Sequence, residues 1–183
     1  PCADGAYDVV TAIDVLEHIP PAARPPFVAE LCRVARKGIV LAAPFGTVLH
    51  RTIEQEAERL VNKATGGGTE TARFLREHLE YGLPTLQEVE DLFAACQREI
   101  WFAGDCRRAF ARFRRGLRLR KFTRHLGLLG ELLVIMVQAN WLRRPVLARE
   151  AREWSNRIYV VCDLRAVCRD VSGSPATATG GTH

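Results

Sequence analysis

The stretch Tyr7-Asp8-Val9-Val10-Thr11-Ala12-Ile13, followed at residues 39–43 by Ile-Val-Leu-Ala-Ala, decides the fold. Both runs are short, apolar and rich in β-branched residues. Such runs are typical of strands that are buried on both faces of a sheet. We therefore expect two neighbouring strands inside an α/β domain.

The segment between these two strands predicts a helix. Pro20 and Pro21 can occupy its first turn, where a missing N–H costs nothing. Apolar residues then recur on one helical face: Phe27, Leu31, Val34 and Ala35. The helix is expected to run to about Arg36, with Lys37-Gly38 as its C-terminal cap. Strand, helix and strand form a βαβ unit, which implies a parallel sheet covered by helices on both sides.

The rest of the chain is predicted to be mainly helical. The expected elements are, in order, a helix at 47–63, a flexible link at Gly66-Gly67-Gly68, helices at 71–81 and from Pro84, a strand at 98–103, helical segments at 105–153 and a strand at 156–163. Residues 171–183 have the composition of a disordered tail. We interpret residues 1–170 as a portion of one domain, with helical insertions at about 47–82 and 105–153.

Composition constrains the function only loosely. The 183 residues carry a net charge of +5, with a pI of about 9.1, which favours an anionic partner weakly. None of the six cysteines forms a Cys-x-x-Cys pair, so the usual spacing of zinc ligands is absent and reduced thiols are expected. The first residues lack the pattern of a secretory signal, and we expect a cytoplasmic protein.

Two stretches resemble a known family. Residues 4–20 read Asp-Gly-Ala-Tyr-Asp-Val-Val-Thr-Ala-Ile-Asp-Val-Leu-Glu-His-Ile-Pro, and residues 30–44 read Glu-Leu-Cys-Arg-Val-Ala-Arg-Lys-Gly-Ile-Val-Leu-Ala-Ala-Pro. In order and separation they are similar to the fourth strand, the next helix and the fifth strand of class I S-adenosylmethionine-dependent methyltransferases of the type 11 kind. The resemblance implies a Rossmann-like sheet, S-adenosyl-L-methionine as cofactor and methyl transfer as the activity.

The family's Gly-rich cofactor loop, Gly-x-Gly-x-Gly, is absent. In such folds this loop brings the backbone close to the cofactor at a helix N-terminus. The acidic residue that ends the family's second strand is absent too. Both would precede Pro1, so we expect a C-terminal fragment that binds cofactor poorly by itself.

The resemblance also implies where the site lies. Ligands of open parallel sheets bind beyond the carboxyl ends of the strands. At the carboxyl end of the first strand, the candidates for cofactor binding are Asp14, Val15 and Leu16. Glu17 is a candidate for substrate binding. His18 is the candidate general base, because an imidazole accepts a proton near neutral pH. The acceptor is expected to be a small-molecule or lipid-linked compound, methylated at oxygen.

A metal site is a further interpretation of this segment. Asp14, Glu17 and His18 are similar to the Glu-x-x-Glu-His motif by which some O-methyltransferases hold a divalent metal, with Asp in place of the first Glu. Two carboxylates and an imidazole suit a hard or borderline cation, and His50 or His78 could add a ligand. The simpler interpretation is a solvated turn with carboxylates at a helix start.

His78 and Tyr81 lie on a predicted helix after the second strand. Insertions at this place in the family often cover the acceptor, so both residues are candidates for substrate contact. The alternative is that they are surface residues of an amphipathic helix.

The segment 107–124 is strongly basic. It holds nine Arg and Lys residues without an acidic one, and Phe and Leu recur among them. This pattern fits an anionic membrane surface, a phosphate-bearing ligand or a solvated face, with nucleic acid the less favoured partner. The apolar residues 126–142 are predicted to form a buried helix, since they are too few to span a bilayer. The alternative function is therefore a non-catalytic module that docks through this basic segment.

Overall fold

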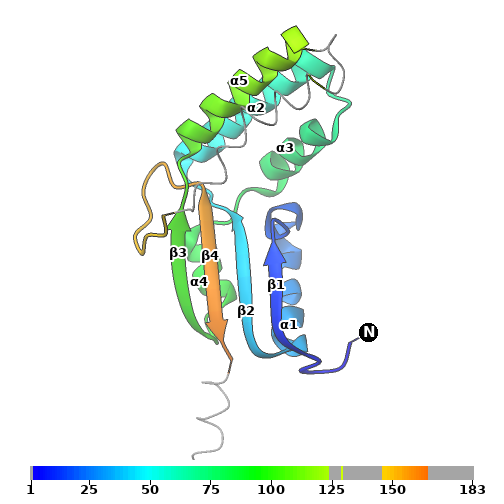
Figure 1. Cartoon of the computed structure of the whole chain (residues 1–183). Helices are drawn as coiled ribbons and strands as arrows, with labels where there is room; N and C mark the ends of the chain where they lie inside the picture. Colours follow the sequence, from blue (N-terminus) through cyan, green and yellow to red (C-terminus); the bar gives the residue numbers. More distant parts are fainter. Residues whose placement is uncertain (1, 124–128, 130–145, 165–183) are drawn as a thin grey trace, which may run out of the picture.

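Four strands form one mixed sheet in the order β1-β2-β4-β3 (Figure 1). The structure is a computed structural model, and it describes residues 2–123, 129 and 146–164. The strands are β1 (Tyr7–Ile13), β2 (Ala35–Pro44), β3 (Gln97–Ala103) and β4 (Arg157–Asp163). β1 runs parallel to β2, whereas β4 is antiparallel to both β2 and β3. The predicted α/β class and the parallel pairing of the first two strands are confirmed, whereas the expected parallel sheet is in fact mixed, because β4 runs against both of its neighbours.

In the described part of the chain, two short 3-10 helices and five α-helices accompany the sheet. They are η1 (Leu16–His18), η2 (Pro21–Ala23), α1 (Arg24–Val34), α2 (Val48–Thr65), α3 (Glu70–Tyr81), α4 (Leu86–Leu92) and α5 (Cys106–Thr123). The α2 and α5 helices pack side by side beyond the carboxyl ends of β1 and β2, and α3 lies against α2 (Figure 1).

Threonine side chains fix the starts of three helices. Thr47, Thr69 and Thr85 precede α2, α3 and α4, and each hydroxyl accepts a hydrogen bond from the amide three residues later. This arrangement satisfies a donor that the helix itself cannot pair. Gly66 ends α2 in the left-handed conformation, with a φ of 72°.

The hydrophobic core lies between one face of the sheet and the α1 and α4 helices. β2 and β4 contribute alternate residues, among them Leu41 and Val160, and the helices contribute Val28 and Val89. Alternation of inward and outward side chains is the rule for a strand with one buried face. The strands therefore build one core and leave the opposite face for other contacts.

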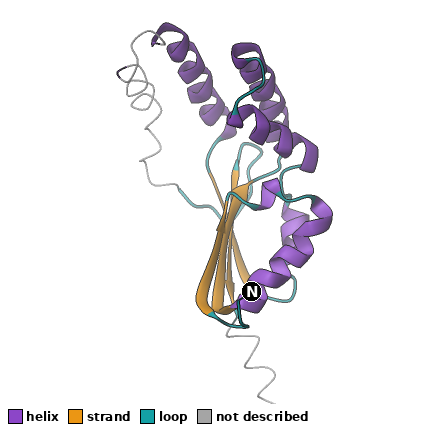
Figure 2. Ribbon diagram, turned by 90° about the vertical axis from the view of Figure 1, so that its right-hand side faces the viewer, coloured by secondary structure: helices purple, strands orange, loops and turns teal. Residues whose placement is uncertain are grey.

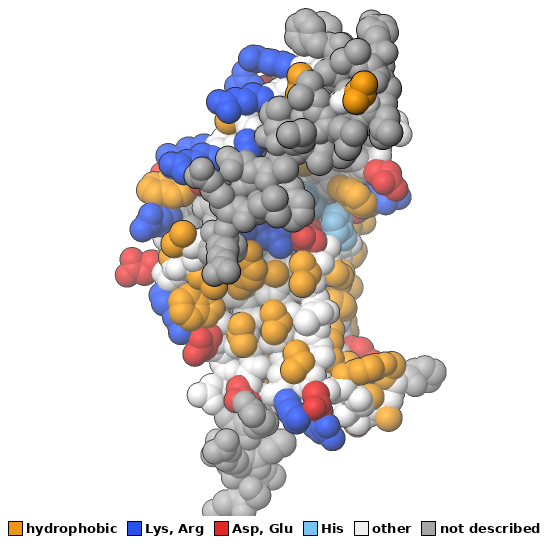
Figure 3. Space-filling view, viewed as in Figure 1, with side chains coloured by type: hydrophobic (Ala, Val, Ile, Leu, Met, Phe, Trp, Pro, Cys, Tyr) orange, Lys and Arg blue, Asp and Glu red, His pale blue; other side chains and the backbone are white. Residues whose placement is uncertain are grey.

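The prediction that helices cover both faces is wrong for the described residues. α1 and α4 lie on one side of the sheet, and no described helix lies on the other (Figure 2). Apolar side chains gather on that open face over the strands, as Figure 3 shows. On this open face, the apolar residues with more than two-fifths of their surface exposed are Tyr7, Val9, Ile13 and Val161. A continuous apolar run thus does not by itself distinguish one buried face from two.

Other boundaries also differ from expectation. The helix before β2 ends at Val34, and Gly38 lies inside β2, paired with Val9 and Asp163, and is not a helix cap. A side chain at Gly38 would meet the carbonyl of Cys162 at 2.8 Å, which accounts for the glycine. Residues 146–153 were predicted helical, but they form a loop that bridges Phe102 at Ala148.

Two predictions fall on residues that lie outside those described. They are the buried helix at 126–142, most of which is not described, and the disordered tail at 171–183. Among the helices that the structure describes, none is long and apolar enough to cross a membrane.

Candidate functional site

The site begins where β1 ends. Asp14 follows the last residue of β1 and takes a left-handed conformation with a φ of 54°, which Asp tolerates better than most residues. Its amide donates to the carbonyl of Ala42 at 2.9 Å, so it remains tied to β2. Its carboxylate accepts a hydrogen bond from Arg157 at 2.5 Å. The sharp turn at Asp14 redirects the chain into η1.

The η1 helix presents its residues in different directions. Leu16 is 1% exposed and belongs to the hydrophobic core, so its side chain anchors the turn. Val15 is more than one-third exposed. Glu17 is buried, with only 1% of its surface exposed, whereas His18 is partly exposed. The two residues that carry titratable groups therefore leave η1 toward the helices that follow β2.

The α2 and α3 helices complete a group of six titratable residues that we call the His–Glu cluster. Its members are Glu17, His18, His50, Glu54, Glu77 and His78. α2 supplies His50 and Glu54 from its first half, and α3 supplies Glu77 and His78 from its last turn. α3 also contacts η1 directly. In Figure 3, histidine side chains are seen at the upper end of the strands, close to acidic ones.

Hydrogen bonds within the cluster orient two imidazole rings. His18 Nδ1 lies 2.8 Å from Glu77 Oε2, and His78 Nδ1 lies 3.0 Å from Glu54 Oε1. A carboxylate only accepts, so Nδ1 carries a proton, and in the neutral form of each ring Nε2 keeps its lone pair. The two rings lie 4.9 Å apart between centroids. His50 is oriented differently, because its Nδ1 bonds the carbonyl of Phe45 at 2.8 Å.

Three buried polar atoms of the cluster have no hydrogen-bond partner. They are Glu17 Oε2, Glu54 Oε2 and His78 Nε2. Glu17 Oε1 lies 3.9 Å from His18 Nε2, which is too long for a hydrogen bond. Buried polar groups are usually paired, because an unmet one costs roughly 1–3 kcal/mol. Three such atoms in one cluster mark it as a place where an additional group can bind.

The surroundings alter the pKa of two members. Burial raises the pKa of Glu17 above its ordinary value, and the negative charge of Asp14 adds to this effect. Burial lowers the pKa of His78, but its hydrogen bond to Glu54 and the charges of Glu54, Glu17 and Glu77 outweigh this, so the net shift is upward. Perturbed groups of this kind are common in functional sites.

The structure brings some predicted site residues together and leaves others apart. Glu17, His18 and His78 meet in the cluster. Asp14 is paired with Arg157, and the carbonyl of Tyr81 accepts from Arg24. Within the described part of the chain, one group of His, Cys, Asp or Glu side chains is placed so that it could hold a metal ion. Its members are Glu17, His18 and His78, and Asp14 is not among them.

Sequence reasoning missed Glu54 and Glu77. Glu54 lies four residues after His50, on the same side of α2, and Glu77 directly precedes His78. A His and a Glu four residues apart on an amphipathic helix were the available signal. Nothing in the local sequence, however, indicates that these helices pack against the turn after β1.

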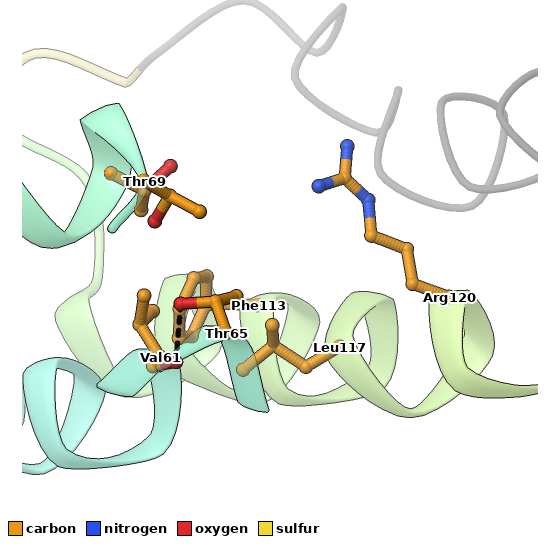
Figure 4. Close-up of a pocket in the computed structure, with 7 residues that line it drawn as sticks. Val61, Thr65, Thr69, Phe113, Leu117 and Arg120 are labelled. Atoms are coloured by element: carbon orange, nitrogen blue, oxygen red, sulfur yellow. Dashed lines mark hydrogen bonds between the residues drawn. The ribbon is translucent and has the colours of Figure 1, made fainter. Parts of the chain in front are cut away.

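A separate cavity lies at the far end of α2. It has a volume of about 330 Å³ between α2, the start of α3 and α5, and its lining combines threonine and apolar side chains with Arg120 (Figure 4). Val61 and Thr65 line it from α2, about two and three helical turns beyond Glu54. The cavity is thus distinct from the His–Glu cluster.

Comparison with known proteins leaves the family open. No protein-family model matches this chain, and a search of curated proteins finds no match.

Proposed function

We propose that this chain is the C-terminal part of a class I S-adenosylmethionine-dependent methyltransferase. The observation that carries the proposal is that the two resembling stretches fold as neighbouring parallel strands, with residues 14–18 at their carboxyl end. Ligands of such sheets bind at that end. β3 and β4, which follow the insertions after β2, are compatible with the last strand pair of that family.

The cofactor would approach from the exposed side of the turn. Asp14 and Val15 are available there, since the Asp14 carboxylate is half-exposed and Val15 is partly exposed. Leu16 would contribute through its backbone alone, because its side chain lies in the core. Cofactor binding would also require the Gly-rich loop that this chain lacks.

The acceptor would lie against Glu17, His18 and His78. Methyl transfer is an in-line displacement, in which the protein aligns the acceptor and removes its proton. In the proposed reaction the acceptor oxygen attacks the methyl carbon, the carbon–sulfur bond breaks, and the acceptor proton passes to a base. His18 Nε2 suits this task, because Glu77 holds the opposite nitrogen of the ring. An acceptor hydroxyl is thus favoured over carbon or nitrogen.

Calorimetric titration of S-adenosylhomocysteine tests this proposal. We expect no binding by this chain and binding by a version extended upstream through its own reading frame to include a Gly-x-Gly-x-Gly segment. In the extended version, His18→Ala should lower kcat by about 100-fold or more with smaller effect on cofactor affinity. The proposal fails if the extended chain does not bind S-adenosylhomocysteine.

A second candidate function rests on α5. Several of its arginines are exposed: Arg107, Arg108, Arg114, Arg115, Arg118 and Arg120. Arg120 also lines the cavity between α2, α3 and α5. Among the described residues of α5, none is acidic. A basic helix of this kind suits an anionic membrane surface. The test is whether the chain floats with vesicles that contain phosphatidylserine. Flotation of the unaltered chain, weakened in the double variant Arg114→Gln with Arg115→Gln, would support the docking module.

A further inference from the structure

We infer that Glu17, His18 and His78 form a three-ligand site for a divalent transition-metal ion. Each residue offers one ligand atom, and these atoms lie within 4.8 Å of one another. Around a tetrahedral zinc ion with ligand bonds near 2.1 Å, the ligand atoms are about 3.4 Å apart. The distances between the ligand atoms would therefore have to shorten by roughly an ångström when the ion binds.

The orientation of the two imidazoles is the first argument. Histidines that bind metals almost always donate the other ring N–H to a carboxylate or carbonyl. His18 meets this condition through Glu77, and His78 through Glu54, at 2.8 and 3.0 Å. Both hydrogen bonds fix the ring so that Nε2 is the unprotonated nitrogen. The cluster thus contains the supporting carboxylates of a metal site as well as its ligands.

The unpaired atoms are the second argument. His78 Nε2 is buried without a partner, and so is Glu17 Oε2 on a side chain that is 2% exposed. A second proton on His78 would not resolve this, since Nε2–H would be a buried donor without an acceptor. A cation bound between these atoms satisfies the lone pairs of both.

Charge is the third argument. Arg73 lies 3.7 Å from Glu77. Within the described part of the chain, no Lys or Arg lies within ion-pair distance of Glu17 or Glu54, although both are buried. Buried carboxylates are expensive unless a positive charge compensates them. A divalent ion supplies that charge at the centre of the cluster.

The donor set selects the class of metal. Two imidazole nitrogens and one carboxylate oxygen suit zinc, iron, cobalt or manganese, whereas calcium and magnesium prefer oxygen ligands alone. Three protein ligands leave a position open, as in catalytic sites. If the proposed function holds, that position would take the acceptor oxygen, and the ion would lower its pKa so that the acceptor proton passes to water. His18 Nε2 would in that case bind the ion and would not act as the base.

The test is a titration of the metal-free chain with Co²⁺ and with Zn²⁺, followed by calorimetry and by the visible absorption of bound cobalt. We expect one ion per chain, with Mg²⁺ and Ca²⁺ at least about tenfold weaker. Glu17→Gln and His78→Gln should each weaken binding by about 100-fold or more. Glu77→Gln should weaken it by about 10- to 100-fold, because it removes an orienting carboxylate.

His50→Gln is the matched control, since His50 lies beside Glu54 on the same helix but outside the three-ligand set. It should bind cobalt like the unaltered chain. Thermal unfolding in a chelator shows whether each variant folds, and added Zn²⁺ should raise the Tm of the unaltered chain but not of Glu17→Gln. The inference is overturned if the chain binds no ion, prefers Mg²⁺, or keeps its affinity in Glu17→Gln and His78→Gln. No cofactor is needed, so this result is independent of the S-adenosylhomocysteine titration.

Discussion

Arg24 is a charged residue that lies inside the protein, with 2% of its surface exposed. Its guanidinium pairs with Glu88 at 2.7 Å and donates to the carbonyls of Ile19, Tyr81 and Gly82. One side chain thus joins the turn after β1 to the end of α3 and the start of α4. These hydrogen bonds help to hold the end of α3 near η1.

Replacing Arg24 with Met should destabilise the protein by about 3 kcal/mol, because the carbonyls of Tyr81 and Gly82 lose their donor. Glu88 is partly exposed and can be rehydrated, so it contributes less of this loss. Urea denaturation of the two proteins measures the difference. Arg33→Met is the control: Arg33 pairs with Glu30 and Asp4 near the surface, and its loss should destabilise the protein much less than the loss of Arg24. Equal effects of the two substitutions would contradict this role of Arg24.

At the scale of the element, most helices and strands follow from local sequence. The limits of β1 were predicted to the residue, because Asp4-Gly5 and Asp14 bound an apolar run. The end of α1 was misplaced, since Arg36 and Lys37 look like a helix end but pair with Asp8 on the neighbouring strand. Such partners lie 28 or 29 residues away, beyond the reach of a local pattern.

The α5 helix depends on Asp105 at its start. The Asp105 carboxylate accepts hydrogen bonds from the amides of Arg107 and Arg108 and pairs with the Arg107 guanidinium. The Arg107 hydrogen bond lowers the pKa of Asp105, as do the two amides. Asp105→Ala should therefore cost about 1 kcal/mol of stability at pH 7.

The pH dependence of this effect follows from the direction of the shift. A carboxyl whose pKa is lower in the folded state stabilises the protein above its unfolded pKa, near 4, and loses that contribution as the pH falls through the folded value. Urea denaturation at pH 7 and near pH 3 should show the unaltered chain losing its advantage over Asp105→Ala at the lower pH. An advantage that persists unchanged in acid would argue against this role.

At the scale of the whole molecule, the candidate site is assembled from distant parts of the chain. His18 and His78 are 60 residues apart, and their rings meet because α3 folds back onto η1. The sequence indicated each histidine separately, and the cluster of Asp14, Glu17 and His18 by its spacing. Asp14 instead pairs with Arg157, which is 143 residues away. Local spacing identifies residue types suited to a site, but only tertiary packing selects its members.

The open face of the sheet should make the chain self-associate. Val9 and Val161 are 55% and 42% exposed on that face, beside other apolar side chains, and such surfaces favour association. We expect the weight-average mass in sedimentation to rise with protein concentration. The double substitution Val9→Lys with Val161→Lys should keep the chain monomeric, because two like charges would face their copies. Val48→Lys is the control, since Val48 is 80% exposed but lies on α2, away from the face. The same association in the double variant and the control would exclude this face as its cause.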